Sequence, residues 1–448
     1  MQHDLTKGPI TRTMLSFAAP MIAGNLLQQF YNIADTLIVG KFLGAQALAA
    51  VGSAFSLMTF LTSILLGLCM GSSAVFSIRY GQRNEEKLKS SIFVSFVMIA
   101  AVTVVINLLV FVLIEPIIRF MNVPSDVYQM MYDYLWVIFV GISFVFLYNF
   151  FAALLRAVGN SLAPLLFLAF SAITNIVLDL VFVLVFKMGV AGAAWATVIA
   201  QILSAVGITI YTLVKFPQFF PERKYRKMNL VVLKEIFQYA FLTCIQQSVM
   251  NFGILMVQGL VNSFGTAVMA AFAAAVKIDS FAYMPVQDFG NAFSTFAAQN
   301  FGAQKEERIR KGIRSAISVT VAFCLVISVL VFGFARQLML IFVQPQETEI
   351  LSIGVEGTFY CGIGCLFLLY GFYRAVRRPG ISVVLTVISL GTRVALAYLL
   401  SAIPAIGVVG IWWSIPIGWF LADLAGLLYY RKHKKELLFQ DTEKGLQA

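Results

Sequence analysis

The sequence predicts an all-α polytopic membrane protein with twelve transmembrane helices in two parallel six-helix lobes, related by a pseudo-two-fold axis along the membrane normal. Three observations lead to this fold class. Hydrophobic residues make up 60% of the chain and charged residues 12%, against about 25% charged residues in a usual soluble domain. Twelve apolar stretches are long enough to cross a bilayer, and the second half of the chain repeats the first.

Each of the twelve apolar stretches reaches the roughly 20 residues that a transmembrane helix needs. The second and the eighth are long enough to tilt strongly or to extend past the bilayer. The start of the chain has no cleavable signal pattern, so we expect the first helix to remain in the mature protein. The expected spans are, in chain order, 14–40, 47–78, 91–114, 131–153, 163–186, 191–214, 236–261, 268–299, 315–335, 352–373, 381–401 and 407–430.

The repeat has an offset of about 220 residues. Each half holds an even number of spans, so both halves enter the membrane from the same side and the repeats are parallel. We therefore expect an N-lobe at 1–214, a cytoplasmic linker at 215–233 and a C-lobe at 234–448. A duplicated block of six hydrophobic segments is typical of a secondary transporter. The repeated segments are GQRNEEKLKSSI from Gly81 and GAQKEERIRKGI from Gly302, Arg156-Ala157-Val158 and Arg374-Ala375-Val376, and GVAGAAW from Gly189 and GVVGIWW from Gly407.

The basic residues indicate the orientation in the membrane. With a cytoplasmic N-terminus, 26 of the 32 Lys and Arg residues fall on the cytoplasmic side, as the positive-inside rule requires. Both termini are therefore expected in the cytoplasm, in a multi-pass protein of the cell membrane. The net charge of +11 has this topological cause and does not indicate a nucleic-acid partner. The linker has two prolines and a basic run suited to anionic lipid headgroups.

Several other functions find no support in the sequence. The only histidines, His3 and His433, lie in the polar ends, so a membrane-embedded enzyme is the weaker alternative. A nucleotide-binding loop of the GxxxxGK[ST] type is absent, which argues against direct use of ATP. Cys361 and Cys365 lie one helical turn apart, but no His or carboxylate close by completes a metal site. We expect no cofactor beyond a coupling ion.

The first span carries a polar stripe. Gln28, Asn32 and Asp35 lie within about 60° of one another on a helix, and Tyr31 stands beside them. Pro20 lies fifteen residues before Asp35 and removes one backbone hydrogen bond, so we expect a hinge there.

The fifth span adds Asn175 and Asp179, which are four residues apart and so share a helix face. A charge at mid-membrane costs about 2.5 kcal/mol or more, so two carboxylates in one lobe call for a reason. With Asp35 they could share a proton or hold a small cation. The alternative is that each aspartate only hydrogen-bonds a neighbouring helix.

The second lobe differs at these positions. The counterpart of the first-span acid is Met256, so we expect cation coupling to be asymmetric. The eighth span carries Lys277, Asp279 and Asp288, and the eleventh carries Arg393. Lys277 and Asp288 face the same way and could pair, as could Arg393 with either aspartate. These residues are candidates for substrate binding, and a charge-neutral structural network is the alternative.

The chain resembles the multidrug and toxic compound extrusion (MATE) family, in its DinF and MepA-like branch, over essentially its whole length. The resemblance rests on the twelve spans, the two repeats, the spacing of Pro20 and Asp35, the Asn175/Asp179 pair and the GVAGAAWAT start of the sixth span. It implies a cation site in the first lobe, with Gln28 lining the same cavity. That implied site consists of Asp35, Asn175, Asp179 and Thr197.

The expected function is secondary active antiport. The chain would export amphipathic, cationic compounds in exchange for H⁺ or Na⁺ by alternating access, as a monomer. In some members of the family an acidic residue on the seventh or eighth span contributes to drug binding, and Asp288 resembles it. The 41 Phe and 16 Met residues suit flat hydrophobic cations. The alternative is a lipid-linked precursor flippase of the same superfamily, which would favour a more cationic cleft.

Overall fold

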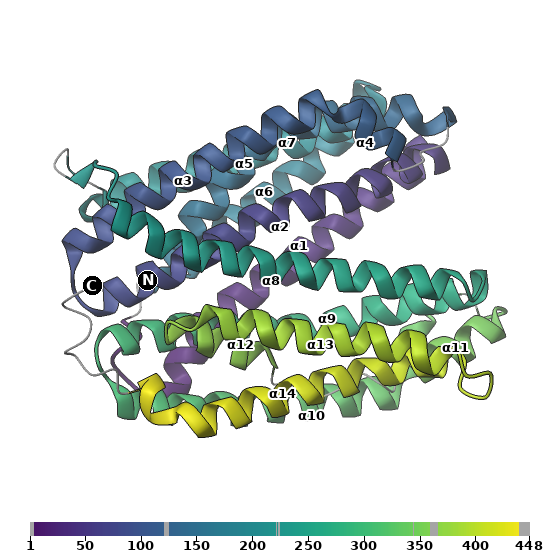
Figure 1. The fold of residues 1–448 in the computed structure, drawn as a ribbon. Helices are drawn as coiled ribbons and strands as arrows, with labels where there is room; N and C mark the ends of the chain where they lie inside the picture. The colour runs from purple at the N-terminus through teal and green to yellow at the C-terminus, as the bar shows by residue number, and fades with distance from the viewer. Residues whose placement is uncertain are drawn as a thin grey trace. The chain divides into compact units, whose positions relative to one another are not determined.

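The computed structural model describes residues 4–438 apart from 121–124, 221, 223–224, 344 and 359–365. Within these residues every regular element is a helix (Figure 1). Ten helical segments of this part are long and apolar enough to cross a membrane. Helices dominate because a spanning segment must satisfy its backbone N–H and C=O groups internally, where no water is available.

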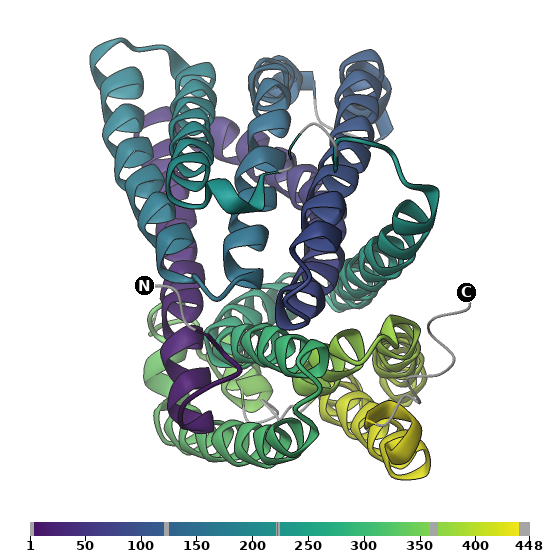
Figure 2. The same ribbon diagram turned by 90° about the vertical axis from the view of Figure 1, so that its left-hand side faces the viewer.

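The first repeat contains six long helices and three short elements, and its helices run alongside one another in two views (Figures 1 and 2). Helix α5 packs against α2, α3 and α7, and α6 packs against α7. Its elements are α1 (Ile10–Leu43), α2 (Ala45–Gly81), α3 (Glu85–Val112), α4 (Ile114–Phe120), α5 (Ser125–Ala157), α6 (Leu162–Leu180), the π-helix η1 (Val181–Val185), α7 (Gly189–Lys215) and the 3₁₀ turn η2 (Pro217–Phe219).

The second repeat follows the same plan. Helix α9 packs against α10, α11 and α12, and α13 packs along α14. Its elements are α8 (Leu230–Asn262), α9 (Thr266–Gly302), α10 (Glu306–Met339), α11 (Thr348–Thr358), α12 (Leu366–Ala375), α13 (Pro379–Ser401) and α14 (Val409–Leu438).

The predicted fold class is confirmed, with three differences in detail. The expected span 352–373 corresponds to α11 and α12, and the residues between these two helices are outside the described part, as are Cys361 and Cys365. The expected span 163–186 changes from α-helix to π-helix after Leu180. Helix α4 is an additional short helix next to the expected third span.

The repeat is visible in the backbone as well as in the sequence. Eight described residues with positive φ fall into four pairs whose members are separated by the repeat offset of 221 or 218 residues. Such φ values are uncommon outside glycine, so their recurrence marks the same turns in both repeats. The pairs are Gly44 and Gly265, Arg83 and Gln304, Gly159 and Arg377, and Gly189 and Gly407.

Internal contacts divide the chain into two compact units that exchange the ends of two helices. Unit 1 contains Met1–Asp4 and Ala19–Cys244, and unit 2 contains Leu5–Ala18 and Ile245–Ala448. The first part of α1 therefore belongs to unit 2 although the rest of the helix belongs to unit 1. Helix α8 changes unit in the same way after Cys244. The boundaries of the six-helix lobes predicted above, 1–214 and 234–448, remain a proposal.

Each unit has its own packed interior. In unit 1, Phe76, Phe139 and Phe150 are almost fully buried in one cluster between the helices. In unit 2, Phe272 packs against the ring of Trp412 with centroids 5.2 Å apart. Large apolar side chains are also exposed along whole helix faces, which suits contact with lipid acyl chains. On α3 the exposed side chains are Val104, Val105, Leu108, Leu109 and Val112.

Small residues allow the closest helix contacts. A Cβ atom on Gly71 of α2 would lie 2.5 Å from Cα of Ala240 on α8, and one on Gly67 would lie 2.7 Å from Cα of Cys244. Lipid supplies no hydrophobic force between helices, so close backbone contact contributes much of their association. These two glycines therefore attach the first half of α8 to unit 1.

Candidate cation site

The residues predicted to hold the cation lie together in unit 1. Helix α1 presents Tyr31 and Asp35 on one face, four residues apart. Helix α6 presents Asn175 and Asp179, which are 1% and 0% exposed. Thr197 lies on α7 and is also buried. Three helices thus supply the polar side chains, and two of these helices pack directly against each other.

Helix α6 changes character directly after Asp179. The π-helical turn η1 begins at Val181, and the N–H of Phe186 donates to the carbonyl of Val181 at 3.0 Å. A π-turn inserts one extra residue per turn, which alters the direction of the side chains on either side of it. It is often found at functional sites, and here it follows the most deeply buried carboxylate of the unit by two residues.

Hydrogen bonds and close contacts connect the five polar side chains into one network. The hydroxyl groups of Tyr31 and Thr197 lie in contact with each other. The side-chain amide of Asn175 is oriented with its nitrogen toward Asp179. In this orientation the amide oxygen accepts from Thr197 Oγ1 at 3.1 Å, and the amide nitrogen donates to Asp179 Oδ2 at 2.9 Å. The carboxyl groups of Asp179 and Asp35 lie in contact with each other. The network therefore begins and ends on α1.

The contact between the two carboxyl groups restricts their charge. An ionised carboxylate has only acceptors, so contact between Asp35 and Asp179 is favourable only when one of them carries a proton or a cation lies between them. In addition, Oδ1 of Asp35 and Oδ1 of Asp179 are buried and accept no hydrogen bond from any described residue. These two oxygens are open positions for a proton or for a small hard cation, which prefers oxygen ligands.

The candidate site offers oxygen ligands and no His or Cys side chain. No group of three or more His, Cys, Asp and Glu residues comes together in the described part of the chain. Cys69, Cys244 and Cys324 lie on separate helices. The oxygen donors of unit 1 fit Na⁺ or a proton better than Zn²⁺, which prefers His and Cys ligands.

The other first-span candidates lie at the edge of the network. Gln28 is exposed and Asn32 is half-buried. Pro20 lies inside α1, next to the point where the helix passes from unit 2 to unit 1. Sequence reasoning missed Tyr134 of α5, a buried residue that interacts electrostatically with Asp35, Asp179 and Tyr31. A phenol in an aromatic-rich span gives no distinctive signal, because lipid-facing helices also carry many aromatics.

A second polar cluster lies in unit 2. The guanidinium of Arg393 on α13 interacts with Asp279 and with Tyr283, both on α9. The ring of Tyr283 stacks on Phe367 of α12 with centroids 6.0 Å apart. Of the pairings that the sequence allowed, the structure therefore brings Arg393 to Asp279.

Lys277 and Asp288 are the other two charged residues of α9. Lys277 is exposed, and its Nζ lies 5.8 Å from the centroid of the Phe342 ring. Asp288 is 4% exposed and belongs to the same helix, after Pro285. A carboxylate this deeply buried in a membrane helix is expensive, which keeps Asp288 as the candidate for contact with a substrate.

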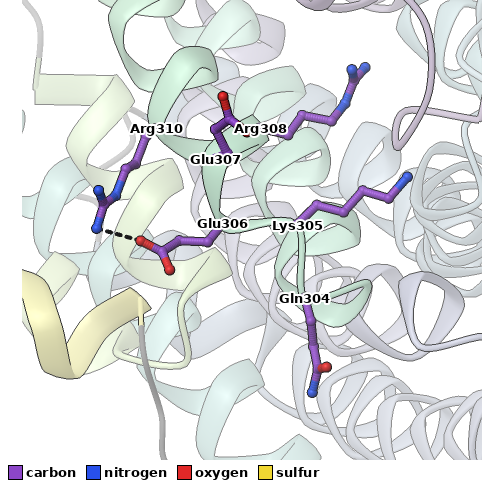
Figure 3. Close-up of a pocket in the computed structure, with 6 residues that line it drawn as sticks. All are labelled: Gln304, Lys305, Glu306, Glu307, Arg308 and Arg310. Atoms are coloured by element: carbon purple, nitrogen blue, oxygen red, sulfur yellow. Dashed lines mark ion pairs between the residues drawn. The ribbon is translucent and has the colours of Figure 1, made fainter.

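A hollow of about 650 Å³ lies at the turn between α9 and α10 (Figure 3). It is lined by charged and polar side chains of residues 304–310, and Arg310 pairs with Glu306 at 2.5 Å on one side of it. None of the predicted site residues lines it. It is therefore separate from the cation network and from the cluster at Arg393.

Comparison with known proteins agrees with the resemblance over the whole chain. The MatE family model matches residues 20–181 and again residues 240–399. A probable multidrug resistance protein of Bacillus subtilis, YpnP, is 29% identical over 450 residues, covering 99% of both chains. The multidrug export protein MepA of Staphylococcus aureus is 23% identical over 434 residues, covering 94% of both. The FAD transporter of Shewanella oneidensis is 25% identical over 443 residues, covering 95% of both.

The fold has counterparts among solved structures. A multidrug resistance MATE transporter in an outward-facing conformation superimposes with a TM-score of 0.89 at 22% identity, covering 98% of this chain and 100% of that one. A transporter of the MOP superfamily from Pyrococcus furiosus, described as having a binding pocket of reverse polarity, superimposes with a TM-score of 0.90 at 22% identity over the same shares. At this identity the likeness concerns the fold alone. The two family matches cover most of the chain, which therefore belongs to the MATE family of multidrug efflux transporters and is not an enzyme.

Proposed function

We propose that this transporter is an antiporter whose coupling ion binds at Asp35 and Asp179. The observation that carries the proposal is the network from Tyr31 to Asp35, with a buried Oδ1 atom on each aspartate that accepts no hydrogen bond from the described residues. If the aspartates only joined helices, Asn or Ser could make the same bonds with far less desolvation. Besides α1, the network includes residues of α6 and α7. Binding of an ion there therefore changes the contacts that hold α1 to these two helices.

The coupling ion that this geometry favours is the proton. The carboxyl groups of Asp35 and Asp179 lie in contact, and a single proton between them would allow a hydrogen bond there. Loss of that proton leaves two like charges in contact in a low-dielectric site, which disfavours the observed arrangement. Na⁺ is the alternative, because a cation between the two carboxylates would relieve the same repulsion.

The proposed substrates are amphipathic cations taken from the cytoplasm. Two relatives are named for multidrug resistance or export, and the buried carboxylate of Asp288 in unit 2 would attract a cation. Exchange of one proton for one monovalent cation moves no net charge. Only the pH gradient would then drive it, with about 1.4 kcal/mol per pH unit. We further propose that the monomer is the working unit and that both termini face the cytoplasm, because of the distribution of Lys and Arg.

Proteoliposomes with separately imposed gradients test the proposal. The purified protein is reconstituted, and movement of ethidium is followed under a proton gradient, under a sodium gradient and under neither. We expect ethidium transport only with the proton gradient, and its loss in Asp35→Asn. Transport driven by a sodium gradient alone would show that the coupling ion at this site is Na⁺ and not the proton. Equal transport without any gradient would contradict antiport altogether.

A second class of substrate has support from one buried cation. Arg374 of α12 is 5% exposed, and its Nη2 donates to Asn291 Oδ1 at 3.2 Å, while its buried Nε finds no acceptor among the described residues. A relative is named as an FAD transporter, and FAD is an anion. An anionic substrate would be driven by the membrane potential as well, with about 2.3 kcal/mol per charge per 100 mV. Transport of a flavin nucleotide that responds to an imposed potential, and that Arg374→Gln abolishes, would favour this class.

A further inference from the structure

The N-terminal segment Leu5–Gly8 is bound along its backbone by one arginine of α10. Arg308 Nη1 donates to the carbonyl of Gly8 at 2.7 Å, and Nη2 donates to the carbonyl of Lys7 at 2.6 Å. Nε and Nη2 both donate to the carbonyl of Leu5 at 3.3 Å. The guanidinium also lies 5.5 Å from the centroid of the Phe296 ring. One side chain thus holds the whole segment from its first carbonyl to its last.

Two neighbouring side chains complete this grip. Lys305 Nζ donates to the carbonyl of Thr6 at 2.8 Å, and Asn300 Nδ2 donates to the carbonyl of Leu5 at 3.1 Å. The side chain of Leu5 itself is 0% exposed. Figure 3 shows Lys305 and Arg308 extending to the same side, away from Arg310. We call Asn300, Lys305 and Arg308 the N-terminal clamp; all of its bonds lie within unit 2.

The clamp continues into the first turns of α1. Thr11 Oγ1 is hydrogen-bonded to Ser315 Oγ of α10 at 2.7 Å. Met14 and Phe17 are 1% and 0% exposed. The part of α1 that belongs to unit 2 ends at Ala18, two residues before the proline inside this helix. Hydrogen bonds and buried side chains therefore anchor the start of α1 in unit 2.

The opposite end of the same helix is attached to unit 1. Asp35 and Tyr31 bind Asp179 and Thr197 in the network described above, and Val39 is 0% exposed in the core of that unit. Helix α1 is thus fixed to one unit at its start and to the other unit at its ion-binding turns.

Helix α8 has a corresponding attachment at the related position of the other repeat. Arg79 of α2 is 4% exposed, its Nη2 pairs with Glu235 of α8 at 2.5 Å, and its Nη1 donates to the carbonyl of Lys87 at 2.8 Å. Arg79 and Asn300 are 221 residues apart, which is the repeat offset. In unit 1 the last turns of α2 hold the first turns of α8, and in unit 2 the last turns of α9 bind the segment that leads into α1. The recurrence indicates that these attachments belong to the architecture of the fold.

We propose that Arg308 is a positioning residue for transport, which fixes the start of α1 to unit 2 through the backbone of residues 5–8. With that end fixed, a rearrangement at Asp35 has to be taken up within α1, between the clamp and the ion network. Without the clamp, the start of the helix can shift instead, and ion binding loses its effect on unit 2. The inference rests on the proposed ion-coupled function. The bonds go to backbone carbonyls, so the presence of the segment matters more than its side chains.

The test uses four forms of the full-length transporter beside the wild type. They are Arg308→Ala, Arg308→Lys, a deletion of residues 2–8, and the deletion combined with Arg308→Ala. Lys311→Ala is the matched control, because Lys311 lies one turn further along α10 and makes only an exposed pair with Glu307 at 2.7 Å. The readouts are amide hydrogen exchange of residues 5–17, ethidium affinity in detergent, and the maximal rate of ethidium transport in proteoliposomes.

We expect Arg308→Ala to raise exchange in residues 5–17 at least 10-fold and to lower the maximal rate at least 5-fold. Ethidium affinity should remain within 2-fold, and Arg308→Lys should recover part of the rate with one donor group. The deletion should have the same effect on exchange and rate. The combined form should lose no more activity than either single change, because both changes remove the same interaction. Lys311→Ala should behave as wild type.

Three results would overturn the inference. Unchanged exchange in Arg308→Ala would mean that the clamp does not hold the segment. Raised exchange with an undiminished rate would mean that the clamp is structural only. An additive loss in the combined form would mean that Arg308 acts by another route. Arg308→Lys applies the same criteria if the alanine variant does not fold. Failure of the proposed function is distinct, since the wild type itself would then show no gradient-driven transport.

Discussion

Replacement of Asp179 by Asn removes a protonatable group while retaining the shape of the side chain. In the wild type, Asp179 Oδ2 accepts from the Asn175 amide at 2.9 Å and the other contact goes to Asp35. An amide at position 179 can accept from Asn175 and from a protonated Asp35 through its oxygen, while its nitrogen takes the position of Oδ1, which accepts no hydrogen bond from the described residues. No member of the network loses its partner, so the free energy of unfolding should change by no more than about 1 kcal/mol, the usual net contribution of one hydrogen bond.

The functional loss should be much larger than the structural one. For exchange of one proton for one monovalent cation, a gradient of two pH units supplies about 2.8 kcal/mol and sustains a substrate ratio of about 100. Asp179→Asn can neither take up nor release the proton, so the substrate ratio across the membrane should fall to about 1. Asp35→Asn should give the same result, because both carboxyl groups share the contact.

The assay is ethidium accumulation in proteoliposomes at imposed gradients of zero, one and two pH units. Asp133→Asn is the matched control, because Asp133 is an exposed carboxylate of α5 that accepts from Gln129 at 2.8 Å and is not one of the five side chains of the network. The control should follow the wild-type dependence on the gradient. If Asp179→Asn keeps the wild-type substrate ratio at two pH units, the assignment of the ion site is wrong.

Three further predictions concern the rest of the chain. Pro20→Ala restores one backbone hydrogen bond in α1, and it should slow turnover at least 10-fold while ethidium affinity stays near normal. Affinity and transport rate are measured on the same preparation. Undiminished transport would show that α1 needs no hinge at this position. Asp288→Asn should change substrate range or affinity more than ion dependence in the same liposomes, whereas lost thermal stability with an unchanged substrate profile would identify a structural carboxylate. Gly71→Ala would place a Cβ atom 2.5 Å from Cα of Ala240 and should lower stability by about 1–3 kcal/mol. Thermal unfolding in detergent measures this loss. Gly52→Ala is the control, because its added Cβ atom meets nothing within 4 Å.

Much of the fold could be predicted because lipid imposes simple rules. A span must be helical, long and apolar, so each expected span has a helical counterpart in the described residues. The repeat found in the sequence has its counterpart in the recurring turns of the backbone. The ion site was accessible for a similar reason: Asn175 and Asp179 are four residues apart, and charged residues are rare enough in spans to stand out. Thr197 came from the family resemblance, because a threonine in a helix is too common to indicate a site by itself.

The remaining features depend on contacts between distant segments. No local pattern marks the π-turn after Leu180 or distinguishes Tyr134 from lipid-facing aromatics. Helical periodicity allowed Lys277 to pair with Asp288, but the structure places Lys277 near Phe342 and brings Arg393 to Asp279. Periodicity and composition likewise do not show that α1 and α8 each belong partly to one unit and partly to the other. This division depends on contacts with residues far away in the sequence.

Proton release on substrate binding tests the central claim most directly. If protons bind at Asp35 and Asp179 and oppose substrate binding, substrate must in turn lower proton affinity, since coupling is reciprocal. Ethidium added to the purified transporter in weakly buffered detergent solution, near the pH where the network titrates, should therefore release protons. Release should saturate with the bound ethidium and vanish in the Asp35→Asn/Asp179→Asn double variant, which should still bind ethidium. Binding of ethidium without proton release at any pH, or release that persists in the double variant, would contradict the account.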